Sequence, residues 1–441
     1  DGGNPGENKS RIQPEDLTDD VFNFVFADPK KSIAMPKSKI PKETLDKMRK
    51  EFLYWYPMDL RVSGKDLIQN HLTMSLYNHA AIWSENPEMW PRSFYTNGHV
   101  QLDNQKMSKS TGNFLTLEDA VEMFGSDACR LALAEAGDGL EDSNFSKDTA
   151  DKTILKLTTL EEWIDEHIAA AESLRKGTFS IFDKTFDNEM NTIVGEACKA
   201  YEEMRFRDAV VNVFHGMLTA RDWYREYVVG GLHIDLVKKF IKLISLTLAP
   251  ICPHFCEHIY AKAAKLIGVS GMVVDAKWPD LPKTDKVLSA QTDYIRALSS
   301  NIRSTLAKQK KKAEGKTTLK LTISKDLPEW KTFVLKSLKD SYDEKGALLD
   351  NKSLSSKMKE SGLFKNKKMM KNAMSYAAML QAGFRTRGVK ALQTEILFDE
   401  AQLVKDSTNI LIKGTPFQKV EVAEAAENDR AEPGKPTISY L

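Results

Sequence analysis

Hydrophobic and polar residues alternate along the 441-residue chain with a period that changes from one stretch to the next. Apolar positions at helical spacing predict short helices over 16–27 and 41–57. Residues 58–64 have the pattern of a short strand. A long amphipathic helix is predicted over 65–83, where the apolar positions at helical spacing are Leu67, Ile68, Leu72, Leu76 and Ala80. A strand followed by a turn and a helix is the building block of a doubly wound α/β sheet, whose ligands bind at the carboxyl ends of the strands.

Short strands and helices are expected next, between residues 93 and 137. Asn97-Gly98 is typical of a hairpin turn, so two strands are predicted on either side of it. Thr116 and Asp119 have the spacing of a capping box, which predicts that a helix begins there. A second helix is expected to begin at Ser126.

Residues 150–285 are nearly all helical in pattern and predict a helical bundle. The long helical segments are 153–174, 188–204, 206–228 and 235–267. Pro250 and Pro253 lie inside the last segment and are expected to kink or divide it.

The pattern changes again after residue 286. A lysine-rich helix end precedes an alternation of Leu319, Leu321 and Ile323 that predicts a strand. A lysine- and serine-rich helical region follows, and 388–414 combines strand and helix signals. We therefore expect three domains: an α/β domain over 1–149, the bundle over 150–285 and an α+β appendage over 286–441.

Composition narrows the class of protein. Hydrophobic residues make up 41% and charged residues 28%, the formal net charge is +1, and no apolar run is long enough to span a membrane. The polar, acidic start of the sequence resembles neither a secretory signal nor a transit peptide, and we expect the chain to be a fragment. Four cysteines lie in helical patterns without a disulfide-like framework, which favours a reducing intracellular compartment. They are Cys129, Cys198, Cys252 and Cys256.

Residues 106–110 read KMSKS, followed by a threonine and Gly112. Two lysines among small residues are typical of a solvated surface loop, and equally of a mobile loop that grips a polyphosphate. Lys106 and Lys109 could follow negative charge as it grows on a leaving group, while the small residues let the loop move. The pentapeptide alone does not separate these interpretations, but its context does.

That context is an ordered set of segments, which are 55–72, 97–116 and 248–260. Together they resemble the second half of the class I aminoacyl-tRNA synthetases, and among these the leucine enzymes of the eukaryotic cytosol. The resemblance is strongest from about residue 20 to 280 and weaker after residue 280. Other class I members carry KMSKS too, so the choice of leucine depends on the flanking segments.

The resemblance implies a fold that is α/β and then mostly α. It comprises the second half of a Rossmann-like catalytic domain, a helical bundle of the anticodon-binding type, and an α+β appendage that contacts tRNA. It implies the activation of leucine with ATP and Mg²⁺ and its esterification to tRNA(Leu), in the cytoplasm and without a membrane. Participation in a larger synthetase assembly stays open.

The resemblance also assigns roles to residues. Lys106 and Lys109 would stabilise the departing pyrophosphate, and the rest of the loop would bind ATP. These further loop residues are Met107, Ser108 and Ser110. Removing one such donor typically costs about 3–4 kcal/mol of transition-state stabilisation.

A second group of candidates follows the first predicted strand. Judged from the local sequence by itself, Asp66 is explained by the preference of aspartate for the first turn of a helix. The resemblance makes it a ligand of the ATP ribose, beside Gly64, which would let the nucleotide approach the backbone. His71 becomes a neighbouring residue of the ATP pocket, or else an ordinary helix histidine.

The segment around Cys252 and His258 has the residue types of a metal site. One helix would place its four candidate ligands on two faces, so we expect buried free cysteines and no metal. Packing and solvated faces mostly explain the aromatic and basic residues of the bundle, which include Trp163, Arg205, Arg207, Arg221 and Arg225.

Two lysine clusters in the appendage are candidates for contact with RNA phosphate, although such runs are usually solvated. They are Lys308 with Lys310, Lys311 and Lys312, and Lys365 with Lys367, Lys368 and Lys371.

Two features of the resembled family are missing from the sequence. It contains neither a His-x-Gly-His signature nor an editing insertion, so we expect the chain alone to be inactive. A class I synthetase for valine, isoleucine or methionine is the nearest alternative. A non-catalytic RNA-binding or scaffold protein that keeps the fold is another.

Overall fold

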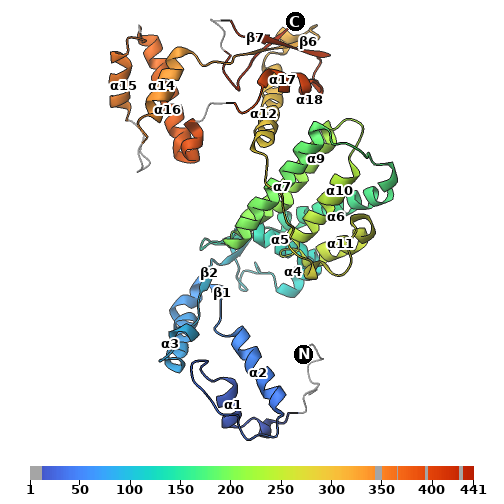
Figure 1. The fold of residues 1–441 in the computed structure, drawn as a ribbon, viewed down its shortest axis with the longest axis vertical. Helices are drawn as coiled ribbons and strands as arrows, with labels where there is room; N and C mark the ends of the chain where they lie inside the picture. Colours follow the sequence, from blue (N-terminus) through green and yellow to red (C-terminus); the bar gives the residue numbers. More distant parts are fainter. Residues whose placement is uncertain (1–11, 343–349, 365, 393–395, 427–430) are drawn as a thin grey trace. The chain divides into compact units, whose positions relative to one another are not determined.

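The computed structural model describes residues 12–342, 350–364, 366–392, 396–426 and 431–441 (Figure 1). Contacts divide the chain into two compact units. The first holds the described residues up to Ala169 together with Glu196–His215 and Ile241–Trp278. The second holds Ala170–Gly195, Gly216–Phe240 and the described residues from Pro279 onwards.

The first unit begins with the two predicted helices. A single 3₁₀ turn, η1 (Pro14–Asp16), precedes α1 (Asp19–Val25) and α2 (Lys42–Trp55). Their apolar faces pack together around Phe24 and Leu45. The guanidinium of Arg49 donates to the Phe24 carbonyl at 2.7 Å, which fixes α2 to the end of α1.

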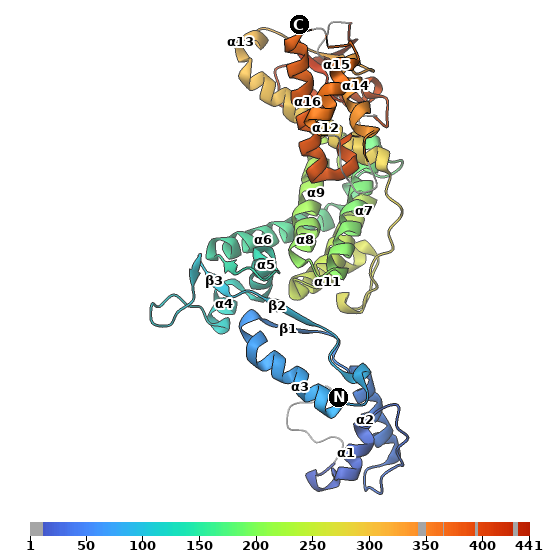
Figure 2. The same cartoon turned by 90° about the vertical axis from the view of Figure 1, so that its left-hand side faces the viewer.

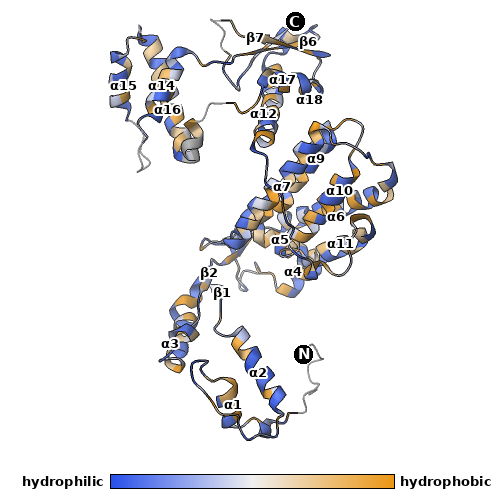
Figure 3. Cartoon of the chain, in the orientation of Figure 1, coloured by the Kyte–Doolittle hydropathy of each residue, from blue (hydrophilic) through white to orange (hydrophobic). Residues whose placement is uncertain are grey.

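The predicted strand and helix follow. Strand β1 (Arg61–Gly64) pairs in parallel with β2 (Phe94–Asn97) in a two-stranded sheet. Between them the chain forms a 3₁₀ turn (Lys65–Leu67), a π-helical turn (Ile68–Leu72), α3 (Thr73–Ile82) and another 3₁₀ turn (Pro87–Met89). Hydrophobic residues of α3 lie among hydrophilic ones along its surface (Figure 3). Of the apolar positions that predicted this helix, only Leu72 is buried.

The predicted turn at Asn97-Gly98 is wrong. Strand β3 (Val100–Leu102) belongs to a second sheet of order β4-β3-β5, with β4 (Gln105–Lys106) antiparallel and β5 (Ser143–Phe145) parallel to it. The hairpin turn is Asp103-Asn104, where both residues have positive φ. Gly98 has a different role, because a Cβ there would lie 2.1 Å from the Glu141 carbonyl oxygen.

Two helices cover this second sheet. In α4 (Leu117–Phe124) the Thr116 hydroxyl accepts from the Asp119 amide at 3.1 Å, which confirms the predicted start, and α5 (Ser126–Ala136) follows directly. Leu102 and Phe145 of the strands pack with Phe124 and Ala128 of the helices.

The bundle helices confirm the helical prediction for 150–267. They are α6 (Lys147–Ala169), α7 (Ile181–Glu202), α8 (Phe206–Val210), α9 (Met217–Tyr227), α10 (Ile234–Leu248) and α11 (Pro253–Ile267). A π-helical turn (Val211–Gly216) joins α8 to α9, and single 3₁₀ turns lie at Ala171–Ser173 and Val273–Asp275. The chain divides at Pro250 and Pro253 as expected, since Pro253 opens α11. Helices α6, α8 and α11 contact α5 within the first unit (Figure 2).

The end of the second unit is an α+β structure. After α12 (Lys286–Lys308) and α13 (Lys310–Ala313) comes a sheet of order β7-β6-β8. Its strands are β6 (Thr318–Ile323), β7 (Lys419–Glu424), parallel to β6, and β8 (Thr437–Tyr440), antiparallel to β6. Leu319 and Leu321 of β6 are fully buried against α12, which confirms the predicted strand.

A helical module interrupts this sheet between β6 and β7. It contains α14 (Glu329–Lys339), α15 (Asn351–Glu360) and α16 (Lys367–Arg387), with its own core around Val334, Leu354 and Ala377. A 3₁₀ turn (Gly388–Leu392), α17 (Glu400–Asp406) and α18 (Thr408–Ile412) lead back to β7. The strand signals expected in 388–414 are therefore wrong for its described residues, and residues 393–395 lie outside them.

Candidate functional site

The KMSKS residues form a closed loop at the end of a hairpin. Lys106 lies in β4, opposite Gln101 of β3. The Ser108 amide donates to the Asn113 carbonyl at 2.9 Å, and the Gly112 amide donates to the Lys109 carbonyl at 3.2 Å. Gly112 has φ +71°, a conformation that glycine adopts without strain, so the chain can turn there.

The short polar side chains of the loop hydrogen-bond within it. The hydroxyls of Ser108 and Ser110 are 2.9 Å apart, and the Thr111 hydroxyl donates to the Ser108 carbonyl at 3.2 Å. Met107 is partly buried and packs against the core of the second sheet, which holds the base of the loop.

The two lysines of the loop are exposed. Within the part of the chain that the structure describes, neither Lys106 nor Lys109 forms an ion pair with a carboxylate. Because their ammonium groups are uncompensated and lie on one short loop, they are available to a polyanionic ligand.

The second group of candidates lies at the carboxyl end of β1. Gly64 pairs with Asn97 of β2, and a Cβ at position 64 would lie 2.5 Å from Oδ1 of Asp66. Glycine thus leaves room for the Asp66 carboxylate to fold back over the strand end. Asp66 is exposed within a 3₁₀ turn, and His71 is exposed within the π-helical turn.

A contact that the sequence analysis missed connects the two groups. The Lys65 ammonium donates to Asp142 Oδ1 at 2.6 Å, and the His99 amide donates to the same oxygen at 2.9 Å. The hydrogen bond from Lys65 is the main reason that the pKa of Asp142 is lowered. Asp142 directly precedes β5, so this contact ties the end of β1 to the sheet that carries the loop. The only hint in the sequence was Gly98, which lies close to Glu141 in the structure. Because the dipeptide Asn97-Gly98 favours a turn, the glycine was interpreted as part of a hairpin.

The structure brings the candidates together in two groups and does not join them directly. Lys106, Met107, Ser108, Lys109 and Ser110 form the loop. Gly64 and Asp66 are in contact at the end of β1. Among the described residues, no hydrogen bond or ion pair connects Asp66 or His71 to the loop.

The cysteine- and histidine-containing segment has structural contacts. Cys252 and Cys256 are buried free thiols, and burial raises the pKa of Cys256 well above its usual value. His258 lies 2.7 Å from a carboxylate oxygen of Glu161. The described residues contain no group of three or more histidine, cysteine, aspartate or glutamate side chains placed to hold a metal ion.

The basic residues of the bundle also have internal partners. Arg205 pairs with Glu203 at 2.7 Å, and Arg221 is buried beside Asp222 at 2.7 Å. Arg225 lies 3.9 Å from the Asp222 carboxylate, and Arg207 donates to a backbone carbonyl at 3.1 Å. Trp163 is buried. These contacts agree with the expectation that packing explains this set.

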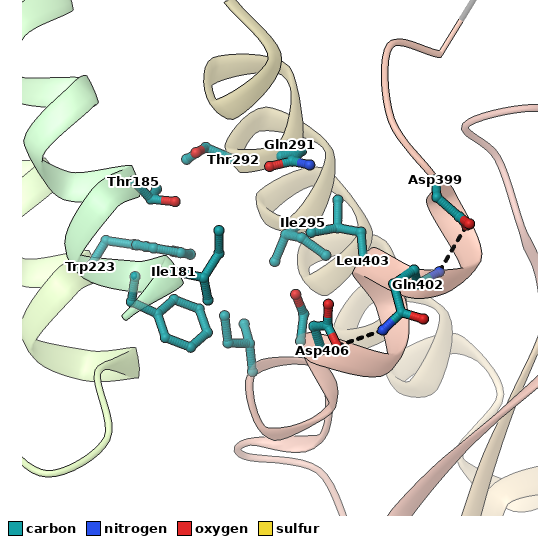
Figure 4. A pocket seen from close by; sticks show the side chains of 13 residues that line it. Ile181, Thr185, Trp223, Gln291, Thr292, Ile295, Asp399, Gln402, Leu403 and Asp406 are labelled. Carbon is teal, nitrogen blue, oxygen red and sulfur yellow. Dashed lines mark hydrogen bonds between the residues drawn. The ribbon is translucent and has the colours of Figure 1, made fainter. Parts of the chain in front are cut away.

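A cavity of about 160 Å³ lies in the second unit, between α7 and α9 on one side and α12, α17 and α18 on the other (Figure 4). Several of its polar side chains bond to one another or to the backbone. Asp399 accepts from the Gln402 amide at 3.0 Å, and the Gln402 side chain donates to Asp406 at 2.9 Å. Trp223 and Ile295 form part of the apolar wall of the cavity.

Comparison with known families divides the chain into three matches. Residues 38–157 match the family tRNA synthetases class I (M). Residues 183–323 match the anticodon-binding domain of tRNA ligases. Residues 323–397, which include the helical module between β6 and β7, match the RagD-binding domain of leucine–tRNA ligase.

Comparison with individual proteins covers nearly the whole chain. It is 38% identical to the cytoplasmic leucine–tRNA ligase of Pongo abelii, over 99% of this chain and 38% of that protein. It is 39% identical to that of Neurospora crassa, over 98% of this chain and 41% of that protein. The chain is a homologue of the cytoplasmic leucine–tRNA ligases. The leucine–tRNA ligase of Arabidopsis thaliana is a further relative, 34% identical over 98% of this chain and 41% of that protein.

This homology agrees with the resemblance of the sequence motifs and with the expected fold. The chain spans about two fifths of the length of the curated leucine–tRNA ligases it matches. No helix among the described residues is both long enough and apolar enough to cross a membrane.

Proposed function

We propose that the protein to which this chain belongs is a leucine–tRNA ligase of the cytoplasm, which activates leucine with ATP and esterifies it to tRNA(Leu). The observation that carries the proposal is 38% identity to a leucine–tRNA ligase over 99% of the chain. The exposed KMSKS loop, with its two uncompensated lysines, supports the same activity.

The loop lysines have a direct chemical role in this proposal. When the leucine carboxylate attacks the α-phosphorus of ATP, negative charge grows on the departing pyrophosphate. Lys106 and Lys109 stabilise that charge as flexible point charges, and because the loop is closed by its own hydrogen bonds it can move toward the phosphates as a unit. Met107, Ser108 and Ser110 complete the contact with ATP.

The end of β1 holds the other part of the nucleotide. Asp66 accepts hydrogen bonds from the ribose hydroxyls, and Gly64 leaves room for that carboxylate at the strand end. His71 lies one helical turn further on and lines the ATP pocket. The Lys65–Asp142 ion pair positions this strand end against the sheet that carries the loop.

Mg²⁺ would enter this site together with the ATP phosphates. The described residues contain no ligand cluster suited to a resident metal ion, so we assign no residue of this chain to the ion. Every step assigned above is performed by side chains of the loop and of the β1 end.

The remaining domains bind macromolecules in this proposal. The bundle, expected over 150–285, leans on the tRNA stem, and the appendage over 286–441 contacts tRNA through the exposed lysines of its second lysine cluster. Of the second lysine cluster, Lys367, Lys368 and Lys371 are exposed, while Lys365 lies outside the described residues. The module within 323–397 binds a protein partner of the RagD kind, because it matches the domain named for that interaction.

An amino-acid panel in pyrophosphate exchange tests the activity. The full-length protein should exchange pyrophosphate into ATP with leucine and then charge tRNA(Leu). Methionine, valine and isoleucine should support far less charging. Methionine-dependent exchange without leucine activity would instead favour a methionine enzyme of the same class. Such an enzyme is tested because the family matched by residues 38–157 is tRNA synthetases class I (M). No exchange with any of the four amino acids would favour a non-catalytic RNA-binding or scaffold protein.

A further inference from the structure

A groove of about 1,120 Å³ lies in the second unit, where α12 and α13 meet the turns that precede β6 and β7 (elements in Figures 1 and 2). Its walls come from residues far apart in the sequence: the last turns of α12, the short α13, the turn around Gly315, and Gly414 with Pro416. It is distinct from the KMSKS loop, which belongs to the first unit.

The rim of the groove is strongly basic. Residues 303–316 contain six basic residues and one acidic residue, Glu314. Arg303 is held from inside the fold, because its guanidinium donates to the Tyr227 hydroxyl at 2.7 Å and to the Lys413 carbonyl at 3.4 Å. The Lys413 ammonium donates to the Glu226 carbonyl and lies 5.3 Å over the Tyr227 ring. These two cations therefore have internal partners.

The other lysines of the rim have none. Lys310, Lys311 and Lys316 line the groove and are exposed, and Lys308 and Lys312 lie beside it. None of the five forms an ion pair with a carboxylate in the described ranges. One or two cations would complement the carboxyl end of α12, but five exceed what a helix end explains.

The floor of the groove is apolar. Ala307 and Pro416 are exposed there, while Leu306 is half-buried and Ala313 is buried in the core below. No aromatic side chain lines the groove. Phosphate binding requires exposed cations but no apolar concavity, and unpaired bases usually stack on aromatic side chains.

We propose that this groove binds an acidic amphipathic helix of a partner protein, whose apolar face lies on Ala307 and Pro416 and whose carboxylates pair with Lys310, Lys311 and Lys316. A concave apolar floor with a cationic rim matches that chemistry, in which a helix places apolar residues in a groove. Uncompensated rim charge accelerates the encounter and selects the sign of the partner. The interaction goes beyond aminoacylation and requires no catalytic residue of the first unit.

The probe is a fluorescein-labelled peptide of about 20 residues, long enough for several helical turns, with glutamates on one face and leucines on the other. A scrambled peptide of the same composition has the same charge but no apolar face. Unfractionated tRNA is the competing probe. The full chain should bind the amphipathic peptide saturably in fluorescence anisotropy, and it should bind the scrambled peptide at least about fivefold more weakly.

Two variants separate the rim from the floor. The triple charge reversal K310E/K311E/K316E should weaken binding of the amphipathic peptide by about tenfold or more. The control K352E/K357E/K359E changes exposed lysines of α15 by the same charge and should change binding less than about twofold. Ala307→Gln keeps the charge and suits a helix but makes the floor polar, so it should weaken peptide binding about three- to fivefold and leave tRNA binding unchanged.

The floor variant decides between protein and RNA. Weaker peptide binding by Ala307→Gln, with unchanged tRNA binding, supports the groove as a protein site even if the triple variant also weakens tRNA binding. The proposal fails if the amphipathic peptide does not bind, if the scrambled peptide binds equally well, or if Ala307→Gln has no effect on peptide binding. Pyrophosphate exchange is measured separately, so a failure here leaves the catalytic proposal untouched.

Discussion

Helices α3 and α10 are both rich in apolar residues, but only α10 is enclosed by the described fold. In α10, Phe240, Ile241 and Ile244 have no exposed surface, whereas α3 has no buried residue and leaves Tyr77 and Ile82 each 69% exposed. Helix α3 is attached to a two-stranded sheet, which offers too little surface to enclose a helix. An apolar pattern thus predicts a helix but does not reveal whether a partner covers its face.

Charged groups show the same contrast. Asp183 is fully buried and accepts from Arg175 at 2.5 Å, from the Tyr224 hydroxyl and from the Ser180 amide at 2.6 Å. Lys106 and Lys109 of the KMSKS loop are exposed and have no carboxylate partner among the described residues. Charge that is satisfied internally stabilises the fold, and charge that is left uncompensated is available to a ligand.

The largest expected effect is the loss of catalytic rate when one of the two uncompensated loop lysines is removed. In the full-length protein, changing either Lys106 or Lys109 to alanine should lower leucine-dependent pyrophosphate exchange by about 10²–10³-fold, the typical loss for one transition-state donor. The affinity for leucine should change little, because the lysines act on the pyrophosphate. Thermal unfolding should also be unchanged, since both side chains are exposed. Exchange at the wild-type rate in the double variant would contradict the role of the loop.

Removing the buried carboxylate of Asp183 should instead lower the stability of the fold. Asp183→Ala should lower the free energy of unfolding by about 3 kcal/mol, because the buried Tyr224 hydroxyl and the Arg175 guanidinium lose their shared acceptor. Asp183→Asn keeps an acceptor and should cost less. Chemical denaturation measures both variants. A loss below about 0.5 kcal/mol for Asp183→Ala would mean that the network contributes little to stability.

The same carboxylate should make stability depend on pH. Burial by itself raises the pKa of Asp183, but hydrogen bonds from Arg175, Tyr224 and Ser180 outweigh it, and the pKa lies below its usual value. A lowered pKa stabilises the folded state above the unfolded pKa of about 3.9, and this contribution is lost as the pH falls through the folded value. Denaturation between about pH 5 and pH 2 should therefore show a steeper loss in the wild type than in Asp183→Asn. Equal slopes would assign the acid sensitivity to other carboxylates.

Local patterns predicted most of the helices and the residues of the loop. Periodicity placed the helices of the bundle, and the capping residue Thr116 marked the start of α4. The lysines and the glycine of the KMSKS segment were recognisable because they are adjacent in sequence. Such features depend on neighbours within a few residues, so one sequence is enough to find them.

Contacts between distant residues were not predictable in the same way. Gly98 has the sequence of a turn, but its function is to let Glu141 approach, 43 residues away. The hairpin turn is Asp103-Asn104, a pair that tolerates positive φ but gives a weaker signal than Asn-Gly. Lys65 and Asp142 form the ion pair between the two sheets across 77 residues. Sequence alone does not specify which of many lysines and aspartates will meet.

The smallest expected effect is that of Ile82→Ala in α3, and it is measured against the same substitution at the buried position Ile244 in α10. Ile244→Ala should lower the free energy of unfolding by about 2–5 kcal/mol, because it leaves a cavity in a fully buried position. Ile82→Ala should change it by less than about 0.5 kcal/mol, because the side chain is 69% exposed. Both variants remove the same atoms from an α-helix and differ mainly in burial, and urea denaturation of the 441-residue chain compares them directly. If Ile82→Ala cost as much as Ile244→Ala, the face of α3 would be packed against a partner in solution, and the contrast between the two helices would disappear.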